Sequence, residues 1–258
     1  MRLKEKIAIV TGGGSGLGRA GALALARAGA KVLVADLNEA SAQETATLIA
    51  QAGGTARACA VDAGNPGDAE RMVRTAVDGF GALHILYNNA GIALPFEDGF
   101  TVRIEPEIWD KVIRVNLSSV FYCSKYAIPE IANAGGGAII NTASSMAHLP
   151  LGGLDGYAAS KGGVAMLTKS MAVGCGPMNI RVNAISPGYV DTPMNTVIWG
   201  NDEMKRGFEK GHLTGLQTPE EIADIVVFLA SNEARSLTGA VINCDRGWTA
   251  FKQPDLLR

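Results

Sequence analysis

Residues 7–18 read IAIVTGGGSGLG, a short apolar run that passes directly into a glycine-rich segment. The apolar run predicts a buried β-strand, and a helix is expected over residues 16–29. Gly12 allows a tight turn, while Gly16 and Gly18 let the backbone approach a pyrophosphate and let the helix pack on the strand. The free N–H groups of that helix would face the anion. The segment therefore favours a nucleotide-binding loop over a glycine-rich turn without a ligand.

Short apolar runs and longer helical patterns alternate along the rest of the chain. Strands are expected at residues 7–12, 31–36, 56–62, 83–91, 138–144, 180–186 and 240–245. Helices are expected at residues 16–29, 39–52, 66–80, 106–133, 155–173 and 219–231. Apolar strands separated by helices form parallel sheets that are covered on both faces. The sequence predicts an α/β fold over residues 1–258, a single-domain doubly wound (Rossmann) sandwich of about seven parallel strands with helices on both faces.

Composition and charge exclude several classes of protein. Of 258 residues, 47% are hydrophobic, and the formal net charge of -2 leaves no basic surplus for nucleic acid. No apolar run approaches the roughly 20 residues that cross a bilayer, and the first is too short for a signal peptide. A soluble, cytoplasmic protein without a metal, nucleic acid or membrane partner is expected. Buried free thiols in a reducing compartment are expected for Cys59, Cys123, Cys175 and Cys244.

A carboxylate at the end of the second strand bears on the choice of cofactor. Asp36 lies about 20 residues after Gly16, where a carboxylate can accept hydrogen bonds from the adenosine ribose hydroxyls. It would repel the 2′-phosphate of NADP, and the neighbouring Leu37 and Ser15 offer no cation to bind that phosphate. The sequence therefore predicts NAD as the cofactor. The alternative for Asp36 is a helix cap or a turn residue.

Six separated motifs lie along the chain in a fixed order. They are TGxxxGxG (11–18), NNAG (88–91), VNL around Asn116, Ser144, YxxSK (157–161), and PG followed by Val190, Thr192 and Met194 (187–194). In this order they resemble the short-chain dehydrogenase/reductase family over nearly the whole chain. The resemblance implies a hydride transfer between a nicotinamide cofactor and a secondary alcohol or ketone.

The resemblance also implies a role for individual residues. Tyr157 would be the catalytic acid/base, Lys161 its electrostatic partner, and Ser144 would hold the substrate oxygen. Asn116 would belong to a water-linked proton relay, and Asp62 would approach the adenine. The expected catalytic set is Asn116, Ser144, Tyr157 and Lys161. The expected cofactor-binding set is Gly12, Ser15, Gly16, Leu17, Gly18, Asp36, Leu37, Asp62, Ala63, Asn89, Ala90, Gly91, Tyr157, Lys161, Pro187, Gly188, Val190 and Thr192.

The spacing of Tyr157 and Lys161 supports the same assignment physically. Residues four apart are neighbours on one helix face. A free tyrosine has a pKa of about 10, which is too high for a base at neutral pH. A nearby ammonium group typically lowers an acid's pKa by roughly 1–3 units, and oxidised nicotinamide adds positive charge. We therefore expect a lowered pKa for Tyr157, although the pair on its own could be ordinary helix surface.

Several other residues near the motifs have structural alternatives. Ser144 rather than Ser145 is expected to be catalytic, because the family places that serine three residues after an asparagine, here Asn141. The helix before Gly174-Cys175-Gly176-Pro177 is expected to end early, and Arg246, where a glycine is common, is expected to alter a subunit contact. Ser160 and His84 are expected to be structural, and contact with substrate is left open for His148 and His212.

Apolar residues in two segments suggest the substrate, with helix packing as the alternative for each of them. A variable lid is expected at residues 189–216, and long irregular stretches are expected at residues 92–105 and 188–217. The apolar residues are Met194, Val197, Ile198, Trp199, Met204, Phe208, Leu94, Phe96, Met146, Leu149, Leu151 and Leu154. A mostly apolar pocket favours a small to medium, hydrophobic or cyclic secondary alcohol or ketone.

The sequence also bears on three alternative functions and on the oligomeric state. A 3-oxoacyl-thioester reductase is the alternative enzyme, but Asp36 argues against it because biosynthetic reductases usually prefer NADP. A non-catalytic dinucleotide-binding sensor would be expected to lose catalytic residues. Dehydration, epimerisation or double-bond reduction often comes with an added domain or a changed Tyr-to-Lys spacing. Relatives pair the helices near residues 106–133 and 155–173 between subunits, so a homotetramer is expected.

Overall fold

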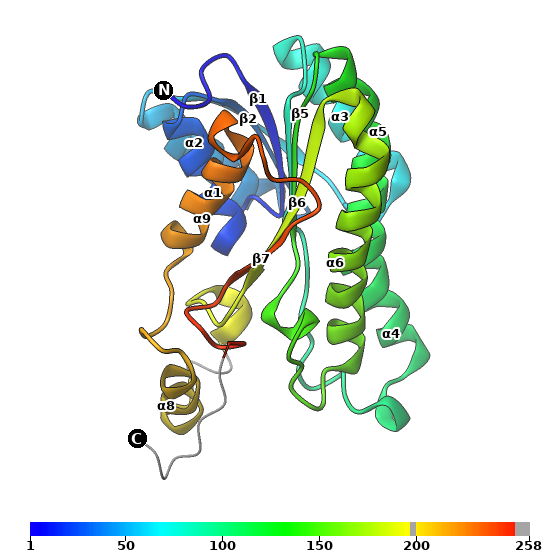
Figure 1. Cartoon of the computed structure of the whole chain (residues 1–258), viewed down its shortest axis with the longest axis vertical. Coiled ribbons are helices and arrows are strands. Elements are labelled where there is room, and N and C mark those ends of the chain that lie inside the picture. The colour runs from blue at the N-terminus through cyan, green and yellow to red at the C-terminus, as the bar shows by residue number, and fades with distance from the viewer. Residues whose placement is uncertain (197–199, 251–258) are drawn as a thin grey trace.

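A computed structural model describes residues 1–196 and 200–250 of the chain. Within them, seven parallel strands form one sheet in the order β3-β2-β1-β4-β5-β6-β7, which confirms the predicted doubly wound fold (Figure 1). The strands are β1 Ile7–Thr11, β2 Lys31–Asp36, β3 Thr55–Ala60, β4 Ile85–Asn88, β5 Gly137–Thr142, β6 Ile180–Pro187 and β7 Val241–Cys244. The α-helices are α1 Gly16–Arg27, α2 Glu39–Gln51, α3 Pro66–Phe80, α4 Pro106–Ile113, α5 Ser119–Asn133, α6 Asp155–Cys175, α8 Asp202–Gly211 and α9 Pro219–Ala230.

The sheet is covered on both faces, as its apolar strands require. Helices α1, α2 and α9 lie on one face, and α3, α5 and α6 lie on the other (Figure 1). Because side chains alternate along a strand, Ala8 and Val10 of β1 belong to the core under α1 and α9. Ile7 and Ile9 belong to the core under α3 and α5. Strand β1 is therefore buried on both faces, with one core on each side of it.

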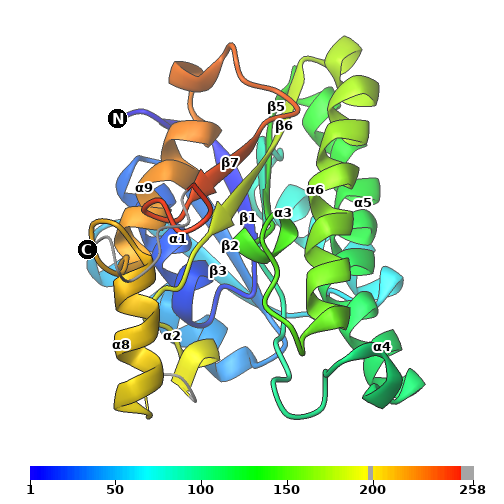
Figure 2. The same cartoon turned by 60° about the horizontal axis from the view of Figure 1, so that its bottom comes forward.

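The strand order reverses between β1 and β4, and this reversal opens a crevice at the carboxyl edge of the sheet. The segments after β1 and after β4 leave the sheet toward opposite faces. Figure 2 brings this edge forward and shows α8 on one side of the strand ends and α4 on the other. The fold thus places the glycine-rich loop, the end of β5 and the segment after β6 around one opening.

Three element boundaries differ from those expected. The long helix expected at 106–133 is divided into α4 and α5 by a π-helical turn, Arg114–Ser118. Helix α6 continues to Cys175, so it does not end as early as expected, and it stops just before Pro177. The stretch expected to be irregular contains α8, whose first N–H groups are capped by the Asn201 side chain.

The predicted start of the last helix is confirmed, and it is more complete than expected. The Thr218 hydroxyl accepts from the Glu221 N–H, and the Glu221 carboxylate accepts from the Thr218 N–H, so a capping box precedes α9. Pro219 occupies the first helical position. In the described part of the chain, no helix is both long enough and apolar enough to cross a membrane.

Candidate functional site

A cavity of about 900 Å³ lies at the carboxyl edge of the sheet. Every residue of the expected cofactor-binding set except Gly18 lines it, and so do Ser144, Tyr157 and Lys161 of the expected catalytic set. One end of the cavity is bordered by Asp36 and Asp62. The polar catalytic candidates lie between that end and an apolar end, so the cavity could hold a dinucleotide and a substrate together.

The glycine-rich loop packs too closely for side chains at two of its positions. A Cβ added to Gly18 would lie 1.9 Å from the Gly12 carbonyl oxygen, so this glycine lets α1 pack against the loop. Gly12 has a φ of +63°, which strongly favours glycine. The Asn89 amide donates to the carbonyl oxygens of Thr11 and Gly12 at 3.2 and 3.3 Å. The loop is therefore held open as a backbone cradle that fits a pyrophosphate.

Asp36 lies beside this loop and holds it in place. Its Oδ2 accepts from the Gly14 N–H at 2.9 Å, and its Oδ1 accepts from the Asn38 N–H at 2.9 Å. A Cβ added to Gly14 would lie 2.9 Å from Asp36 Oδ2, so Gly14 makes room for the carboxylate. The cap of α2 is Asn38, which accepts from the Ser41 N–H. Asp36 is thus a turn residue that also lines the cavity.

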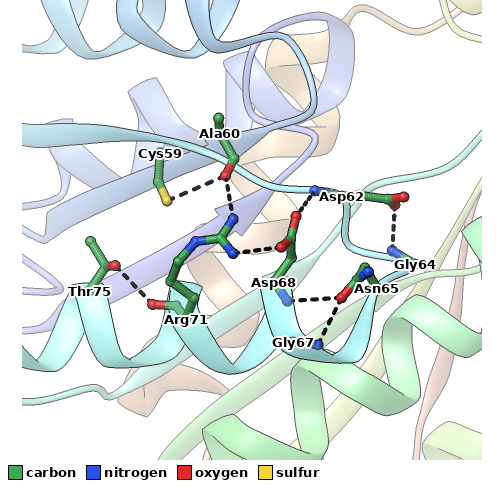
Figure 3. A network of polar contacts seen from close by, with 9 residues as sticks. All are labelled: Cys59, Ala60, Asp62, Gly64, Asn65, Gly67, Asp68, Arg71 and Thr75. Carbon is green, nitrogen blue, oxygen red and sulfur yellow. Dashed lines mark hydrogen bonds and ion pairs between the residues drawn. The ribbon is translucent and has the colours of Figure 1, made fainter.

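A polar network fixes the segment after β3 (Figure 3), and Asp62, Ala63 and Gly64 of this segment line the cavity. The Asp62 N–H donates to Asp68 Oδ2 at 3.0 Å, and Asp62 Oδ1 accepts from the Gly64 N–H at 2.9 Å. The hydrogen bond from Arg71 lowers the pKa of the Asp68 carboxyl. The remaining Asp62 oxygen pairs with Arg114 of the π-helical turn at 2.8 Å. Asp62 therefore joins α3 to the opposite wall of the cavity.

The same network contains a cysteine that is less buried than expected. Cys59 is half-buried, and its thiol donates to the Ala60 carbonyl oxygen at 3.8 Å (Figure 3). Burial raises the pKa of this thiol. All four cysteines are free thiols, and the buried ones are Cys123, Cys175 and Cys244.

Lys161 and Tyr157 occupy one face of α6, and Lys161 is almost fully buried. Its Nζ donates to the Thr142 carbonyl oxygen at 2.8 Å and lies 5.7 Å from the centroid of the Tyr157 ring. Burial lowers the pKa of Lys161 to about 8. Burial also raises the pKa of Tyr157, and a hydrogen bond with Ser144 lowers it only in part. The expected fall of the Tyr157 pKa is therefore wrong for the protein by itself, because desolvation of the phenol outweighs the other effects.

Ser144 stands where β5 ends, and its hydroxyl is the one that reaches Tyr157. The Oγ atom also accepts from the Met146 N–H at 3.1 Å, which caps a short 3-10 turn, Ser145–Ala147. Ser144 and Ser145 both line the cavity, but the hydrogen bond that acts on the phenol of Tyr157 comes from Ser144. The geometry thus favours Ser144, as expected from its distance to Asn141.

Asn116 lies behind the cavity in the π-helical turn and is completely buried. Its side chain accepts from the Ile92 N–H at 2.8 Å and donates to the Ile92 carbonyl oxygen at 2.9 Å. It also donates to the Ser160 hydroxyl at 3.1 Å, and that hydroxyl donates to the Tyr157 carbonyl oxygen at 2.7 Å. A Cβ on Gly91 would lie 3.2 Å from Asn116 Oδ1 and 3.4 Å from Lys161 Nζ. Asn116 and Lys161 therefore approach the same glycine, and Ser160 links Asn116 to α6.

The apolar end of the cavity is built by aromatic side chains from three segments. The rings of Tyr189 and Phe208 lie 3.8 Å apart, and Trp248 lies 5.3 Å from Tyr189 and 5.7 Å from Phe208, centroid to centroid. His212 stacks on Trp248 at 4.9 Å. Of these four residues, Tyr189 and Phe208 line the cavity, so Trp248 and His212 support the wall from behind.

The expected apolar residues divide into three groups. Those that line the cavity are Phe96, Met146, Leu151, Leu154, Met194, Met204 and Phe208. Leu94 and Leu149 are not among its lining residues. Val197, Ile198 and Trp199 lie outside the described residues. About half of the expected set thus faces the opening, with helix α8 contributing Met204 and Phe208.

None of the three histidines lines the cavity. His148 shares a hydrogen bond with the Ser186 hydroxyl at 3.2 Å. His212 accepts from the Tyr189 N–H at 3.2 Å, and its other ring nitrogen donates to the Phe208 carbonyl oxygen at 2.7 Å. His84 accepts from the Ile7 N–H at 3.2 Å, in keeping with a structural role, and burial lowers its pKa. His212 thus fixes the backbone beneath the aromatic wall.

Arg246 makes its contacts within the chain. Its guanidinium group pairs with Glu221 and donates to the Thr214 carbonyl oxygen, so it joins the turn after β7 to the start of α9. Arg246 adopts a left-handed φ of 46°, a conformation in which glycine is more common. The departure from glycine at this position is thus accompanied by an ion pair with the start of α9.

Sequence reasoning did not find several residues that shape the site. Tyr189 and Arg114 line the cavity, while Trp248 and the buried carboxylate of Asp98 support it from outside. Tyr189 directly follows the PG motif, so its position was a usable signal. The other three come from segments distant in sequence, and no local pattern marks them.

The fold and the glycine-rich loop define a doubly wound α/β protein of the dinucleotide-binding type. A family model described as enoyl-(acyl carrier protein) reductase matches residues 12–249. The cyclohexanol dehydrogenase of Acinetobacter sp. (strain SE19) is 40% identical over 249 residues, which cover 96% of this chain and 97% of that protein. The chain belongs to the short-chain dehydrogenase/reductase family, which confirms the resemblance seen in its motifs. It is an oxidoreductase of this family, whose dehydrogenases typically use NAD(P).

Two further similarities agree with this family. The 2,5-dichloro-2,5-cyclohexadiene-1,4-diol dehydrogenase LinX of Sphingobium indicum is 37% identical over 248 residues, covering 96% of this chain and 98% of that protein. A solved structure assigned as a short-chain alcohol dehydrogenase from Sinorhizobium meliloti 1021 superposes with a TM-score of 0.92 at 33% identity, covering 97% of this chain and 98% of that one.

Proposed function

We propose that this protein is an NAD-dependent dehydrogenase that moves a hydride between NAD(H) and a small to medium, hydrophobic or cyclic secondary alcohol or ketone. The observation that carries the proposal is the position of Tyr157, Ser144 and Lys161, which line one cavity between its dinucleotide end and its apolar end. One domain over residues 1–258 would hold both molecules, with residues 189–216 as the substrate lid.

In the proposed mechanism, the chain's own side chains move the proton and hold the reacting oxygen. The nicotinamide ring supplies the hydride acceptor in oxidation and the hydride donor in reduction. Tyr157 takes the hydroxyl proton of the alcohol during oxidation and returns it during reduction. Ser144 donates a hydrogen bond to the same oxygen while charge develops on it. Lys161, when protonated, favours the phenolate of Tyr157, and Asn116 would link Lys161 to solvent through water.

The proposal includes a preference for NAD over NADP. Asp36 lines the ribose end of the cavity, and its carboxylate would accept from ribose hydroxyls and repel a 2′-phosphate. Arg114 also lines that part of the cavity, but its guanidinium group is already paired with Asp62. The balance of charge near Asp36 therefore supports the unphosphorylated dinucleotide.

The substrate class is supported by the walls of the cavity and by the names of two relatives. Phe208, Met204 and Met146 offer apolar surface next to Ser144 and Tyr157. One relative is named for cyclohexanol and another for a chlorinated cyclohexadiene diol. A 3-oxoacyl-thioester reductase is the second candidate, favoured by the acyl-carrier description of the matching family model. Asp36 argues against it, because biosynthetic reductases usually prefer NADP.

Assembly and location complete the proposal. Large apolar side chains are exposed on α4, α5 and α6, among them Trp109, Phe121 and Met166. These helices would pair between subunits and give a homotetramer. The free thiols fit a reducing compartment, so we propose a cytoplasmic enzyme. Light scattering that gives a monomer mass would contradict the assembly.

The experiment that tests the reaction is a panel of cyclic and linear secondary alcohols and ketones, followed by absorbance at 340 nm. We expect turnover with NAD(H) and a loss of kcat of at least about 100-fold in Tyr157→Phe, because removing the acid/base group typically costs 10²–10⁴ in rate. NADH binding by fluorescence is the control, and it should persist in the variant. Full activity of Tyr157→Phe, or activity confined to acyl thioesters, would overturn the proposal.

The cofactor preference has its own test. Asp36→Asn removes the charge while keeping an oxygen that can accept from Gly14. We expect the ratio of kcat/KM for NAD to kcat/KM for NADP to fall by at least about 10-fold, because the repulsion of the 2′-phosphate is lost. Asp68→Asn is the matched control. Asp68 holds the segment after β3 but does not line the cavity, so the ratio should stay unchanged. A wild-type enzyme that already prefers NADP would refute the assignment.

A further inference from the structure

A buried carboxylate holds the first turn of the helix that carries Tyr157. Asp98 lies in the segment between β4 and α4 and is only 2% exposed. Its Oδ1 accepts from the Gly156 N–H at 3.0 Å, and its Oδ2 accepts from the Tyr157 N–H at 2.7 Å. Both oxygens act as acceptors, so the deprotonated carboxylate fits the two amides. A charged group from another segment therefore touches the backbone of the proposed acid/base residue.

The start of α6 needs this contact, since it lacks a cap of its own. The first N–H groups of a helix have no partner within the helix. Leu154 occupies the cap position of α6, and its side chain cannot accept a hydrogen bond. Asp98 supplies the missing acceptor from a distant segment. A second contact lies beside it, where the Thr101 N–H and hydroxyl donate to Asp155 Oδ2 at 2.9 and 2.6 Å.

Gly156 leaves the space that the carboxylate occupies. A Cβ added at this position would lie 3.1 Å from Asp98 Oδ1 and 3.3 Å from Asp98 Oδ2. Gly156 is not among the residues with a positive φ, so its backbone does not require glycine. The close approach of Asp98 is thus the reason that the structure gives for a glycine directly before Tyr157.

We propose that Asp98 is a positioning residue for Tyr157. It fixes the backbone from which the phenol projects, and its negative charge contributes to the pH at which that phenol can act as a base. Lys161, whose Nζ lies 5.7 Å from the centroid of the ring, and Tyr189 are the other titratable groups near the phenol, and both are unchanged in the variants described below. The inference rests on the proposed function, in which Tyr157 exchanges the proton of the substrate. Asp98 itself is not among the residues that line the cavity, whereas Pro95 and Phe96 of the same segment are.

The sign of the charge effect follows from where Asp98 lies. The amino end of a helix carries partial positive charge, which favours a phenolate nearby. The carboxylate of Asp98 offsets that charge and so disfavours the phenolate. Asp98→Asn removes the negative charge and keeps one oxygen that can accept from an amide. The pH at which Tyr157 becomes a base should therefore fall, by about 0.5–1 unit for a partly screened charge several ångströms away.

The test measures kcat/KM for oxidation of cyclohexanol, or of the best alcohol from the panel, against pH. The acid limb is the part of this profile in which kcat/KM rises as Tyr157 becomes a base. In Asp98→Asn, the acid limb should move to lower pH by about 0.5–1 unit. In Asp98→Ala, kcat should fall at least about 10-fold, because both amides lose their acceptor, and Asn should restore part of that loss. Asp155→Asn is the matched control. It removes the same charge from the same turn, but the Asp155 carboxylate is less buried than that of Asp98 and bonds to Thr101 in an exposed position, so solvent screens it and the acid limb should stay in place.

Gly156→Ala probes the same contact without touching the charge. The added methyl group should displace the carboxylate and lower kcat in the wild-type background. In the Asp98→Ala background it should have no further effect, because the group that it displaces is absent. Independent, additive effects of the two substitutions would overturn the proposal, as would an acid limb that does not move in Asp98→Asn or that moves equally in Asp155→Asn.

Hydrogen exchange separates this inference from the proposed function. In the wild type, the Gly156 and Tyr157 amides should exchange slowly without any substrate, and in Asp98→Ala they should exchange at least about 10-fold faster. Unchanged exchange would refute the positioning role even in an active enzyme. Faster exchange in a protein whose Tyr157→Phe variant stays fully active would instead refute the proposed function and leave the contact standing.

Discussion

The two ends of the cavity are built by different means. At the dinucleotide end, the wall is backbone, and its shape depends on missing side chains, as at Gly18, where a Cβ would lie 1.9 Å from a carbonyl oxygen. At the apolar end, the wall is made of side chains that pack across three segments, with Tyr189, Phe208 and Trp248 at its centre. The first end is therefore determined by local sequence, and the second by contacts between distant residues.

The largest expected effect comes from filling the space at the dinucleotide end. Gly18→Ala places a methyl group against the Gly12 carbonyl oxygen, so α1 must move away from the loop. We expect the free energy of unfolding to fall by about 3 kcal/mol. We also expect the Kd for NADH to rise at least about 10-fold, measured by fluorescence titration. If dinucleotide binding remained unchanged, the backbone cradle would not be the feature that holds the cofactor.

A glycine in α8 provides the matched control for this variant. In α8, a Cβ on Gly207 would meet no atom within 4 Å. Gly207→Ala should therefore stabilise α8 by about 0.5–1 kcal/mol and leave the Kd for NADH unchanged, since alanine is the better helix former. The same substitution thus tests both ends, and equal effects at the two positions would remove the distinction between them.

At the apolar end, Trp248 is the residue whose loss should weaken the wall most. Its ring stacks on His212 and contacts Tyr189 and Phe208, although it does not line the cavity itself. Trp248→Ala should raise the KM for a cyclic alcohol about 10-fold, because the wall loses its support. The Kd for NADH should stay within about 2-fold. Trp248→Phe, which keeps a ring, should restore most of the affinity for substrate.

The smallest effect concerns Lys161, which lies where the two ends meet. Burial lowers the pKa of Lys161 to about 8 from its ordinary value of 10.5. The unfolded chain therefore binds more protons between these two values, and this residue makes the free energy of unfolding rise with pH over that range. At pH 7 the buried ammonium group carries its full desolvation cost.

The measurement is denaturant unfolding of the wild type and Lys161→Met at several pH values between about 8 and 10.5, without cofactor. The stability of the wild type minus that of the variant should increase with pH, by at most about 1.4 kcal/mol per pH unit. A flat difference over this range would show that Lys161 keeps an ordinary pKa, and a difference that falls with pH would show that its pKa is raised in the folded protein. In either case, burial would not be the dominant influence on the Lys161 ammonium group.

The contrast between the two ends also explains what the sequence could predict. Apolar strands alternating with helices were sufficient to predict a doubly wound sheet of about seven parallel strands, and glycine spacing was sufficient to predict the tight loop around Gly12. Helix α8 is not predicted from the sequence, because the segment is mostly charged, with Met204 and Phe208 as its only large apolar side chains, and because its cap, Asn201, carries no distinctive signal. Trp248 and Asp98 were not found, because their partners lie in segments that only the folded chain brings together.

The tyrosine pKa shows a different limit. The spacing of Tyr157 and Lys161 correctly predicts that they share one helix face, but the predicted fall of the Tyr157 pKa is wrong. Spacing gives proximity, whereas the cost of desolvation depends on how much of the fold surrounds the phenol. That quantity is a property of the whole cavity, so no motif could supply it.

The π-helical turn at Arg114–Ser118 has a consequence for how the chain can change in length. A π-helical turn holds one more residue than an α-helical turn, so deleting one residue here would let α4 run into α5 as a continuous α-helix. Val112, buried in α4, would keep its place, but Asn116, which lies within the turn, would lose Ile92. We expect this turn to accept substitutions on its exposed side but no insertion or deletion, so sequence alignments of related enzymes should keep its length even where its letters differ.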